Sequence, residues 1–160
     1  MTQFLFTVTF PLAVPFWAIM ILLPNWRWTE RIIESPLIVV PPLLVYLLVM
    51  IPIFPEFWAA VSAPDLAVLQ QVLASPNGSA AVWAQLIGFD LFIGRWMFRD
   101  SRARGISAWL MGPLLLLTIL LSPVGLLGYF VLRAIPAVRS ERRVPSAGFD
   151  RPVATHPVVY

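Results

Sequence analysis

The sequence predicts an all-α membrane protein with four transmembrane helices and a short interfacial helix between the second and the third. Hydrophobic residues make up 59% of the 160 residues and charged residues 12%, whereas roughly 25% of a typical soluble protein is charged. The apolar residues also gather in long runs. We therefore expect residues 1–135 to form one transmembrane domain, and the proline-containing, mixed-charge residues 136–160 to form a disordered tail.

Four apolar segments are long enough to cross a bilayer. A transmembrane helix needs roughly 20 residues at a rise of about 1.5 Å per residue. The first segment lacks the basic start and the small-residue cleavage site of a signal peptide, so we expect it to remain in the protein as a helix. The predicted spans are residues 4–24, 37–55, 79–98 and 108–135.

The segment between the second and third spans is too polar to cross the membrane. Leu66, Leu69 and Leu73 recur at helical spacing after Asp65, and an Asn-Gly pair at 77–78 marks a turn. This pattern predicts a short helix at the membrane surface. Tryptophans near the ends of the spans support the same boundaries, because indole rings favour the membrane interface.

Arginine placement predicts the orientation of the spans. Arg27 and Arg31 follow the first span, Arg99, Arg102 and Arg104 follow the third, and no arginine follows the second. Because basic loops stay on the cytoplasmic side, the loop of residues 99–107 is expected in the cytoplasm and both termini outside.

Five arginines after the last span conflict with that orientation, since they too would prefer the cytoplasmic side. One explanation is that the earlier loops overrule the tail. The other is that the long last segment turns at residues 122–125 and re-enters. We favour four complete spans.

One carboxylate, Asp90, lies deep in the third span. An ionised side chain near the bilayer centre costs on the order of 2.5–3.5 kcal/mol, so such residues are usually functional or paired. On a helical projection Arg95 points about 140° away, which leaves the hydroxyls of Tyr46, Thr118 and Ser122 as partners. If Asp90 stays protonated, it can act as a hydrogen-bond donor or as a general acid.

Further charged side chains gather at the predicted cytoplasmic edge. Glu30 and Glu34 share this edge with Arg99 and Asp100, so a solvated rim of ion pairs is expected there. Arg95 lies closer to the hydrocarbon, and its head either extends to the interface or meets a buried anion.

Several classes of site are excluded by composition. The chain has no cysteine, and its one histidine, His156, lies in the tail, so neither a thiolate nor a histidine-based metal site is expected. At most five arginines fall in any one segment, so no nucleic-acid-binding surface is expected either.

Two stretches carry a resemblance to a known family. "AQLIGFDLFIGRWMFRDSRARGIS" followed by "PLLLLTILLSPVGLLGYFVLR" resembles the neoxanthin-synthase-like family, named for an abscisic-acid-deficient plant mutant. The resemblance covers residues 83–133. It implies that Asp90, Arg95, Asp100, Pro123 and Gly125 are recurring positions of the family.

The resemblance also implies a reaction, in which an epoxy-carotenoid isomerises to an allenic one without a redox cofactor. Asp90 would be the candidate acid, and Arg95 and Asp100 would orient a polar end group. The aromatic and polar candidates for ligand binding are Gln85, which takes the place of a family histidine, Phe89, Phe92, Trp96 and Tyr46.

Two function classes remain open. The first is an isomerase or accessory factor that acts on a carotenoid or isoprenoid lipid by acid–base chemistry. The second is a noncatalytic membrane subunit or pigment-binding scaffold of a larger complex. Expected partners are membrane lipid or carotenoid, other membrane proteins or further copies of the chain. The expected location is a bacterial inner membrane or a photosynthetic membrane.

Overall fold

The computed structural model describes residues 1–135, which form α-helices and two short 3-10 helices, η1 (Pro36–Val39) and η2 (Ile51–Ile53), joined by turns, and contain no strand. The all-α prediction is therefore confirmed, whereas the predicted tail lies outside the described residues. The α-helices are α1 (Thr2–Leu22), α2 (Arg27–Glu34), α3 (Val40–Met50), α4 (Phe54–Ser62), α5 (Leu66–Ala74), α6 (Pro76–Ala103), α7 (Ala108–Leu120) and α8 (Ser122–Ala134).

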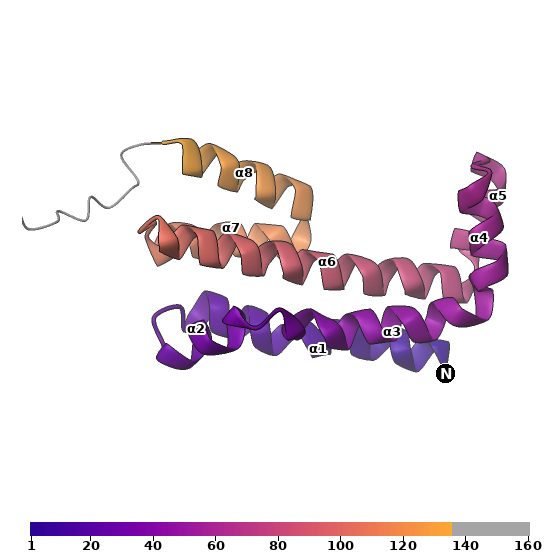
Figure 1. Cartoon of the computed structure of the whole chain (residues 1–160), viewed down its shortest axis with the longest axis horizontal. Coiled ribbons are helices and arrows are strands. Elements are labelled where there is room, and N and C mark those ends of the chain that lie inside the picture. The colour runs from indigo at the N-terminus through magenta and orange to yellow at the C-terminus, as the bar shows by residue number, and fades with distance from the viewer. Residues whose placement is uncertain (136–160) are drawn as a thin grey trace, which may run out of the picture.

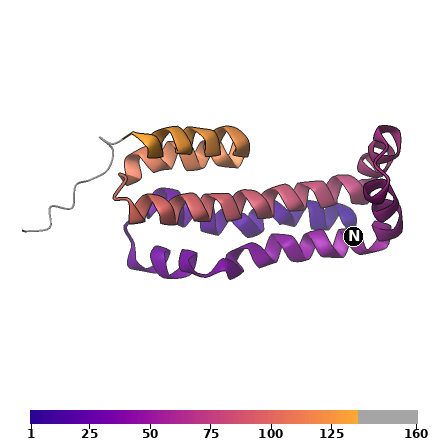
Figure 2. The same ribbon diagram turned by 45° about the horizontal axis from the view of Figure 1, so that its top comes forward.

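The long helices lie parallel or antiparallel to one another and define the long axis of the bundle. Helices α1, α3 and α6 lie side by side, α4 and α5 stand crosswise at one end, and α7 and α8 cover one half of α6 (Figure 1). The turned view in Figure 2 shows the same three groups.

Two helical segments are long and apolar enough to cross a membrane, Thr2–Leu22 and Pro36–Ser62. They match the first two predicted spans. The third predicted span falls within α6, which has 28 residues but does not pass the same test of composition. The predicted helix between the second and third spans is present as α5, and its first turn is capped by Asp65, which accepts hydrogen bonds from the backbone N–H groups of Ala67 and Val68 at 2.9 and 3.0 Å.

The prediction of one continuous span over residues 108–135 is wrong. The helix stops at Leu121, whose φ of −144° and ψ of 73° are not helical, and α8 folds back along α7 (Figure 1). Pro123 supplies no backbone donor to continue α7 and fits the first turn of a new helix. At Gly125 a Cβ atom would lie 2.7 Å from the backbone nitrogen of Thr118, so only glycine permits this close return.

The hairpin brings the end of α8 to the same end of the bundle as the α1–α2 and α6–α7 turns (Figure 1). We call this end the arginine end. It holds the seven arginines of residues 1–135, which are Arg27, Arg31, Arg95, Arg99, Arg102, Arg104 and Arg133. The conflict between the early loops and Arg133 therefore disappears, because α8 ends on their side and not on the opposite one.

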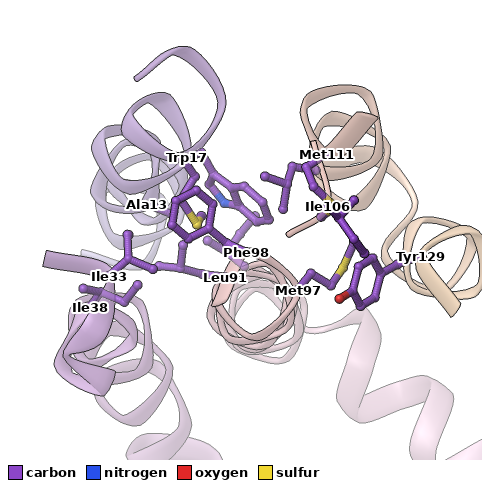
Figure 3. Close-up of a cluster of buried hydrophobic side chains, with 13 residues drawn as sticks. Ala13, Trp17, Ile33, Ile38, Leu91, Met97, Phe98, Ile106, Met111 and Tyr129 are labelled. Carbon is purple, nitrogen blue, oxygen red and sulfur yellow. The ribbon is translucent and has the colours of Figure 1, made fainter. Parts of the chain in front are cut away.

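The core lies where α1, α6, α7 and α8 meet. Trp17 of α1 packs on α6 at Gly94, where any side chain would overlap its ring. Met97 and Tyr129 fill the space between α6 and the hairpin (Figure 3). Further buried members of this cluster are Ala13, Met20, Ile33, Ile38, Ile87, Leu91, Phe98, Ile106, Met111 and Leu115.

Candidate functional site

Asp90 lies in the middle of α6, at the level where the α7–α8 hairpin turns back. Its nearest polar side chain is Ser122, the first residue of α8. The Ser122 hydroxyl is buried yet makes no hydrogen bond. Within residues 1–135 no cationic side chain forms an ion pair with Asp90. The structure thus holds a carboxyl group and a free hydroxyl side by side, with no charge to neutralise the carboxylate.

The other hydroxyls predicted near Asp90 are engaged elsewhere. Thr118 donates to the Leu114 carbonyl at 2.8 Å and contacts the Met97 sulfur at 3.6 Å. Tyr46 belongs to a second cluster, between α3 and the start of α6, with Val49 and Ala81. Of the three candidates only Ser122 reaches Asp90, so the prediction that Tyr46 shares a site with Asp90 is not met by the geometry.

The side chain of Asp90 is accessible from outside the bundle, because the α7–α8 hairpin does not cover the half of α6 that precedes Asp90. Asp90 itself is half-buried. At this depth the side chains of Leu86 and Leu121 are 50% and 56% exposed. A ligand can therefore approach Asp90 from the side of the bundle.

Asp100 lies ten residues further along α6, about 15 Å away along the helix axis. Its Oδ2 atom accepts a hydrogen bond from the Tyr129 hydroxyl at 2.5 Å and one from the Arg104 Nε at 2.8 Å, and Arg133 Nε lies 3.5 Å away. Tyr129 is completely buried. This cluster ties α8 to α6, and its donors are aimed at Asp100 and not at an open space.

The electrostatics of Asp100 fit a structural tie. Burial by itself raises the pKa of this carboxyl group, but the hydrogen bonds from Arg104 and Tyr129 and the charges of Arg104 and Arg133 outweigh it, so the pKa lies below its usual value. Trp96 completes the cluster, with its ring 5.5 Å from that of Tyr129 and 5.8 Å from the Arg133 guanidinium carbon. Trp96 thus packs between the two helices at the arginine end.

The sequence led us to expect that Arg95 either reaches water or binds a buried anion, but in the structure it does neither. It is 9% exposed, and it donates to the Ile33 carbonyl at 2.8 Å and to the Glu34 carbonyl at 2.5 Å. These are carbonyls at the end of α2, which have no partner inside the helix. Arg95 therefore closes α2 against α6, and this role also fits the favourable placement of a cation at a helix C-terminus.

Gln85, Phe89 and Phe92 lie on the outer face of α6, away from both carboxylates. All three are exposed, Phe89 by 54% and Phe92 by 49%. These three candidates for ligand binding therefore do not form an enclosed site, because their positions on the helix turn them outward.

A groove lies elsewhere at the arginine end, between the end of α1 and the start of α7. Its volume is about 940 Å³. Its walls are mainly apolar, and Trp26 and Trp109 stand at its rim, the latter 87% exposed. The lining residues include Leu22, Leu23, Asn25, Arg102, Ser107, Gly112, Pro113 and Leu116.

Sequence reasoning missed Tyr129, Arg133 and the groove. Tyr129 is 29 residues from Asp100, and only the hairpin brings the two together. Two signals could have found the hairpin: the surplus of arginines after the last span, and the Pro-x-Gly element at 123–125. The groove had a weaker signal in the pair of tryptophans at the ends of two different helices.

In residues 1–135, fold and site together define an all-helical bundle with an apolar outer surface, a carboxyl group at mid-height without an ion pair and a groove at its basic end. The model of the family described as "ABA DEFICIENT 4-like" matches residues 4–129. The chain belongs to this family. The resemblance drawn from residues 83–133 is thus confirmed, and the match extends to the first helices.

A curated relative supports the same assignment. Protein ABA DEFICIENT 4, chloroplastic, from Arabidopsis thaliana is 30% identical over 137 residues, which cover 81% of this chain and 60% of the relative. The chain thus spans less than two thirds of the length of this relative. No solved structure matches the chain.

Proposed function

We propose that the chain is embedded in a membrane with its arginine end on the cytoplasmic side or the equivalent side of an organelle membrane. Soluble proteins rarely expose contiguous apolar patches larger than a few hundred Å². Here large apolar side chains are exposed along the full length of the bundle, among them Leu44, Leu47, Leu48, Leu86, Phe89, Leu116, Leu120, Leu127 and Val131. In this arrangement α1, residues 36–53 and residues 79–98 of α6 cross the membrane, α4 and α5 lie crosswise at the far end (Figure 1), and the α7–α8 hairpin enters and leaves on one side.

This topology predicts which sites a membrane-impermeant thiol reagent reaches. Single cysteines placed in the α6–α7 turn and just after Ile135 should be labelled from the same side of the membrane. A cysteine between α4 and α5 should be labelled from the other side, because that loop lies at the opposite end of the bundle. The chain has no native cysteine, so each variant reports one position. Labelling of the position after Ile135 together with the α4–α5 loop would mean that α8 crosses the membrane.

For the activity, we propose acid–base isomerisation of a carotenoid or related isoprenoid lipid, with Asp90 as the proton-transferring group. The carrying observation is the half-buried Asp90, which has no cationic partner among the described residues and lies beside the free Ser122 hydroxyl. Family membership supports the substrate class, because the family includes a plant protein named for abscisic acid deficiency. A carboxyl group without an ion pair is retained inside an apolar bundle chiefly for function.

One carboxyl group can balance both proton transfers of such a reaction. Protonated Asp90 gives its proton to the epoxide oxygen as the ring C–O bond breaks. The resulting carboxylate then removes a proton from the polyene, and the electron pair of that C–H bond forms the new double bond of the allene. The product is an isomer of the substrate, Asp90 is protonated again, and no oxidant or reductant is consumed.

Substitution of Asp90 tests this role. Asp90→Asn keeps the shape and a donor but cannot transfer a proton, so turnover of an epoxy-carotenoid in lipid vesicles should fall by about 10²–10⁴-fold, the usual contribution of general acid–base catalysis. Pigment extracted from the vesicles is separated and quantified. The matched control is Asp65→Asn, which makes the same change at the cap of α5, where asparagine is also a good cap.

A second candidate function is noncatalytic pigment binding, and the groove favours it, since the groove lies at the arginine end and Asp90 does not line it. No turnover by the unaltered protein together with a co-purifying polyene would replace the isomerase by a pigment-binding scaffold. Full turnover by the Asp90→Asn variant would instead show that Asp90 is not the proton-transferring group.

A further inference from the structure

The groove between α1 and α7 combines apolar walls with a polar end that carries no free charge. Among residues 1–135, Arg102 is the only charged side chain in its lining. The guanidinium of Arg102 donates to the Asn25 side-chain oxygen at 3.0 Å and to the Pro24 carbonyl, and its Nε lies 3.3 Å from Glu30. The charge of Arg102 is therefore paired with Glu30, and its two terminal nitrogens donate to the α1–α2 turn, whereas its buried Nε makes no hydrogen bond among the described residues.

The polar groups left for a ligand are neutral. Because the oxygen of the Asn25 amide accepts from Arg102, its NH₂ group is left as a donor. Ser107 precedes α7, and its hydroxyl makes no capping hydrogen bond. The indole N–H groups of Trp26 and Trp109 are further donors at the rim. Such a set suits a hydroxyl or ether oxygen better than an anionic headgroup, which would need an unpaired cation.

The size and position of the groove limit the ligand further. About 940 Å³ lies within the range of about 300–1,000 Å³ that is usual for small-molecule sites. Leu22, Pro113 and Leu116 carry the apolar wall from the polar end along α7 towards mid-height. A molecule in the groove thus has a polar end at the arginine end and an apolar body directed into the hydrocarbon.

We infer that this groove binds the uncharged, hydroxylated ring end of a long isoprenoid chain. The inference rests on the proposed function for the substrate class, and it adds the place where one end of that substrate is held. The groove is remote from the reacting group, since Arg102 and Asp90 are separated by about 18 Å along α6. Binding energy gained there holds the chain in place without taking part in the proton transfers.

Gly112 offers a way to fill the groove without disturbing the helices. It lines the groove, and a Cβ atom at this position meets no atom within 4 Å. In Gly112→Leu the new side chain occupies the groove, and α7 gains helix propensity. Ala134→Leu is the matched control, because it adds a similar apolar side chain at an exposed position of α8.

Binding is measured in phosphatidylcholine nanodiscs from the quenching of tryptophan fluorescence by a carotenoid with hydroxylated rings. Gly112→Leu should weaken this binding by about tenfold or more, which corresponds to about 1.4 kcal/mol, while Ala134→Leu binds like the unaltered protein. A carotenoid hydrocarbon without hydroxyls should also bind less tightly. Unchanged binding by Gly112→Leu, or displacement of the carotenoid by added phosphatidylglycerol, would overturn the inference; the latter would assign the groove to a lipid headgroup.

The two proposals fail in different ways. If Asp90→Asn keeps its turnover while Gly112→Leu loses binding, the proposed chemistry is wrong and the groove assignment stands. If Asp90→Asn loses turnover while Gly112→Leu binds normally, the groove assignment is wrong and the chemistry stands.

Discussion

Gly125→Leu should open the α7–α8 hairpin and destabilise the protein. The backbone nitrogen and Cα of Thr118 would each lie 2.7 Å from the new Cβ atom. Backbone cannot move aside as a flexible side chain can, so the two helices must separate. Overpacking of this kind costs about 1–3 kcal/mol and occasionally more. Thermal unfolding in mild detergent, followed by circular dichroism, measures the loss.

Gly112→Leu serves as the control for the hairpin, because it makes the same change in α7 where the Cβ atom meets open space. Its melting temperature should equal or exceed that of the unaltered protein. If the Gly125→Leu variant has the same melting temperature as the control, α8 does not pack on α7 at Thr118.

Asp100→Ala should destabilise the tie between α6 and α8. It leaves the hydroxyl of the completely buried Tyr129 without its acceptor and removes the partner of Arg104 and Arg133. An unsatisfied buried donor costs about 1–3 kcal/mol. Tyr129→Phe removes the same hydroxyl, so the double variant should lose less stability than the sum of the two single losses. Strict additivity in detergent unfolding would show that the hydrogen bond contributes nothing.

The contribution of Asp100 should also depend on pH. Its pKa is lower in the folded protein than in the unfolded chain, so the folded state favours the charged carboxylate. The stabilisation is complete above the ordinary aspartate pKa of about 3.9 and is lost as the pH falls through the lower folded value. In Asp100→Ala this part of the acid dependence should be absent.

Local sequence patterns predicted the helices but not how the last two pack. Long apolar runs and the cap at Asp65 locate α1, the segment Pro36–Ser62 and α5, because each depends on neighbouring residues only. Two features of the sequence compete at Leu121. The apolar run of residues 108–135 is long enough to cross a membrane, whereas Pro123 and Gly125 favour a turn back along α7. Length alone favoured the wrong alternative.

The candidate site was predicted only in part for the same reason. Asp90 stood out because a carboxylate in an apolar run is costly wherever its helix packs. The role of Arg95 could not be predicted from the apolar run that contains it. Its partners are backbone carbonyls of α2, and the sequence predicted a loop without a helix at those residues. Gln85, Phe89 and Phe92 were predicted to bind a ligand, but their side chains are exposed on α6.

In the topology proposed above, the same-sided hairpin also bears on how the chain would be inserted during synthesis. Each arginine carried across a bilayer adds to the work of insertion. With α7 and α8 entering and leaving together, none of the seven arginines of residues 1–135 has to be translocated. Between α1 and α6, the charged side chains that must pass to the far side are Glu56 and Asp65 alone. The hairpin can therefore be added last, from the side on which the ribosome works.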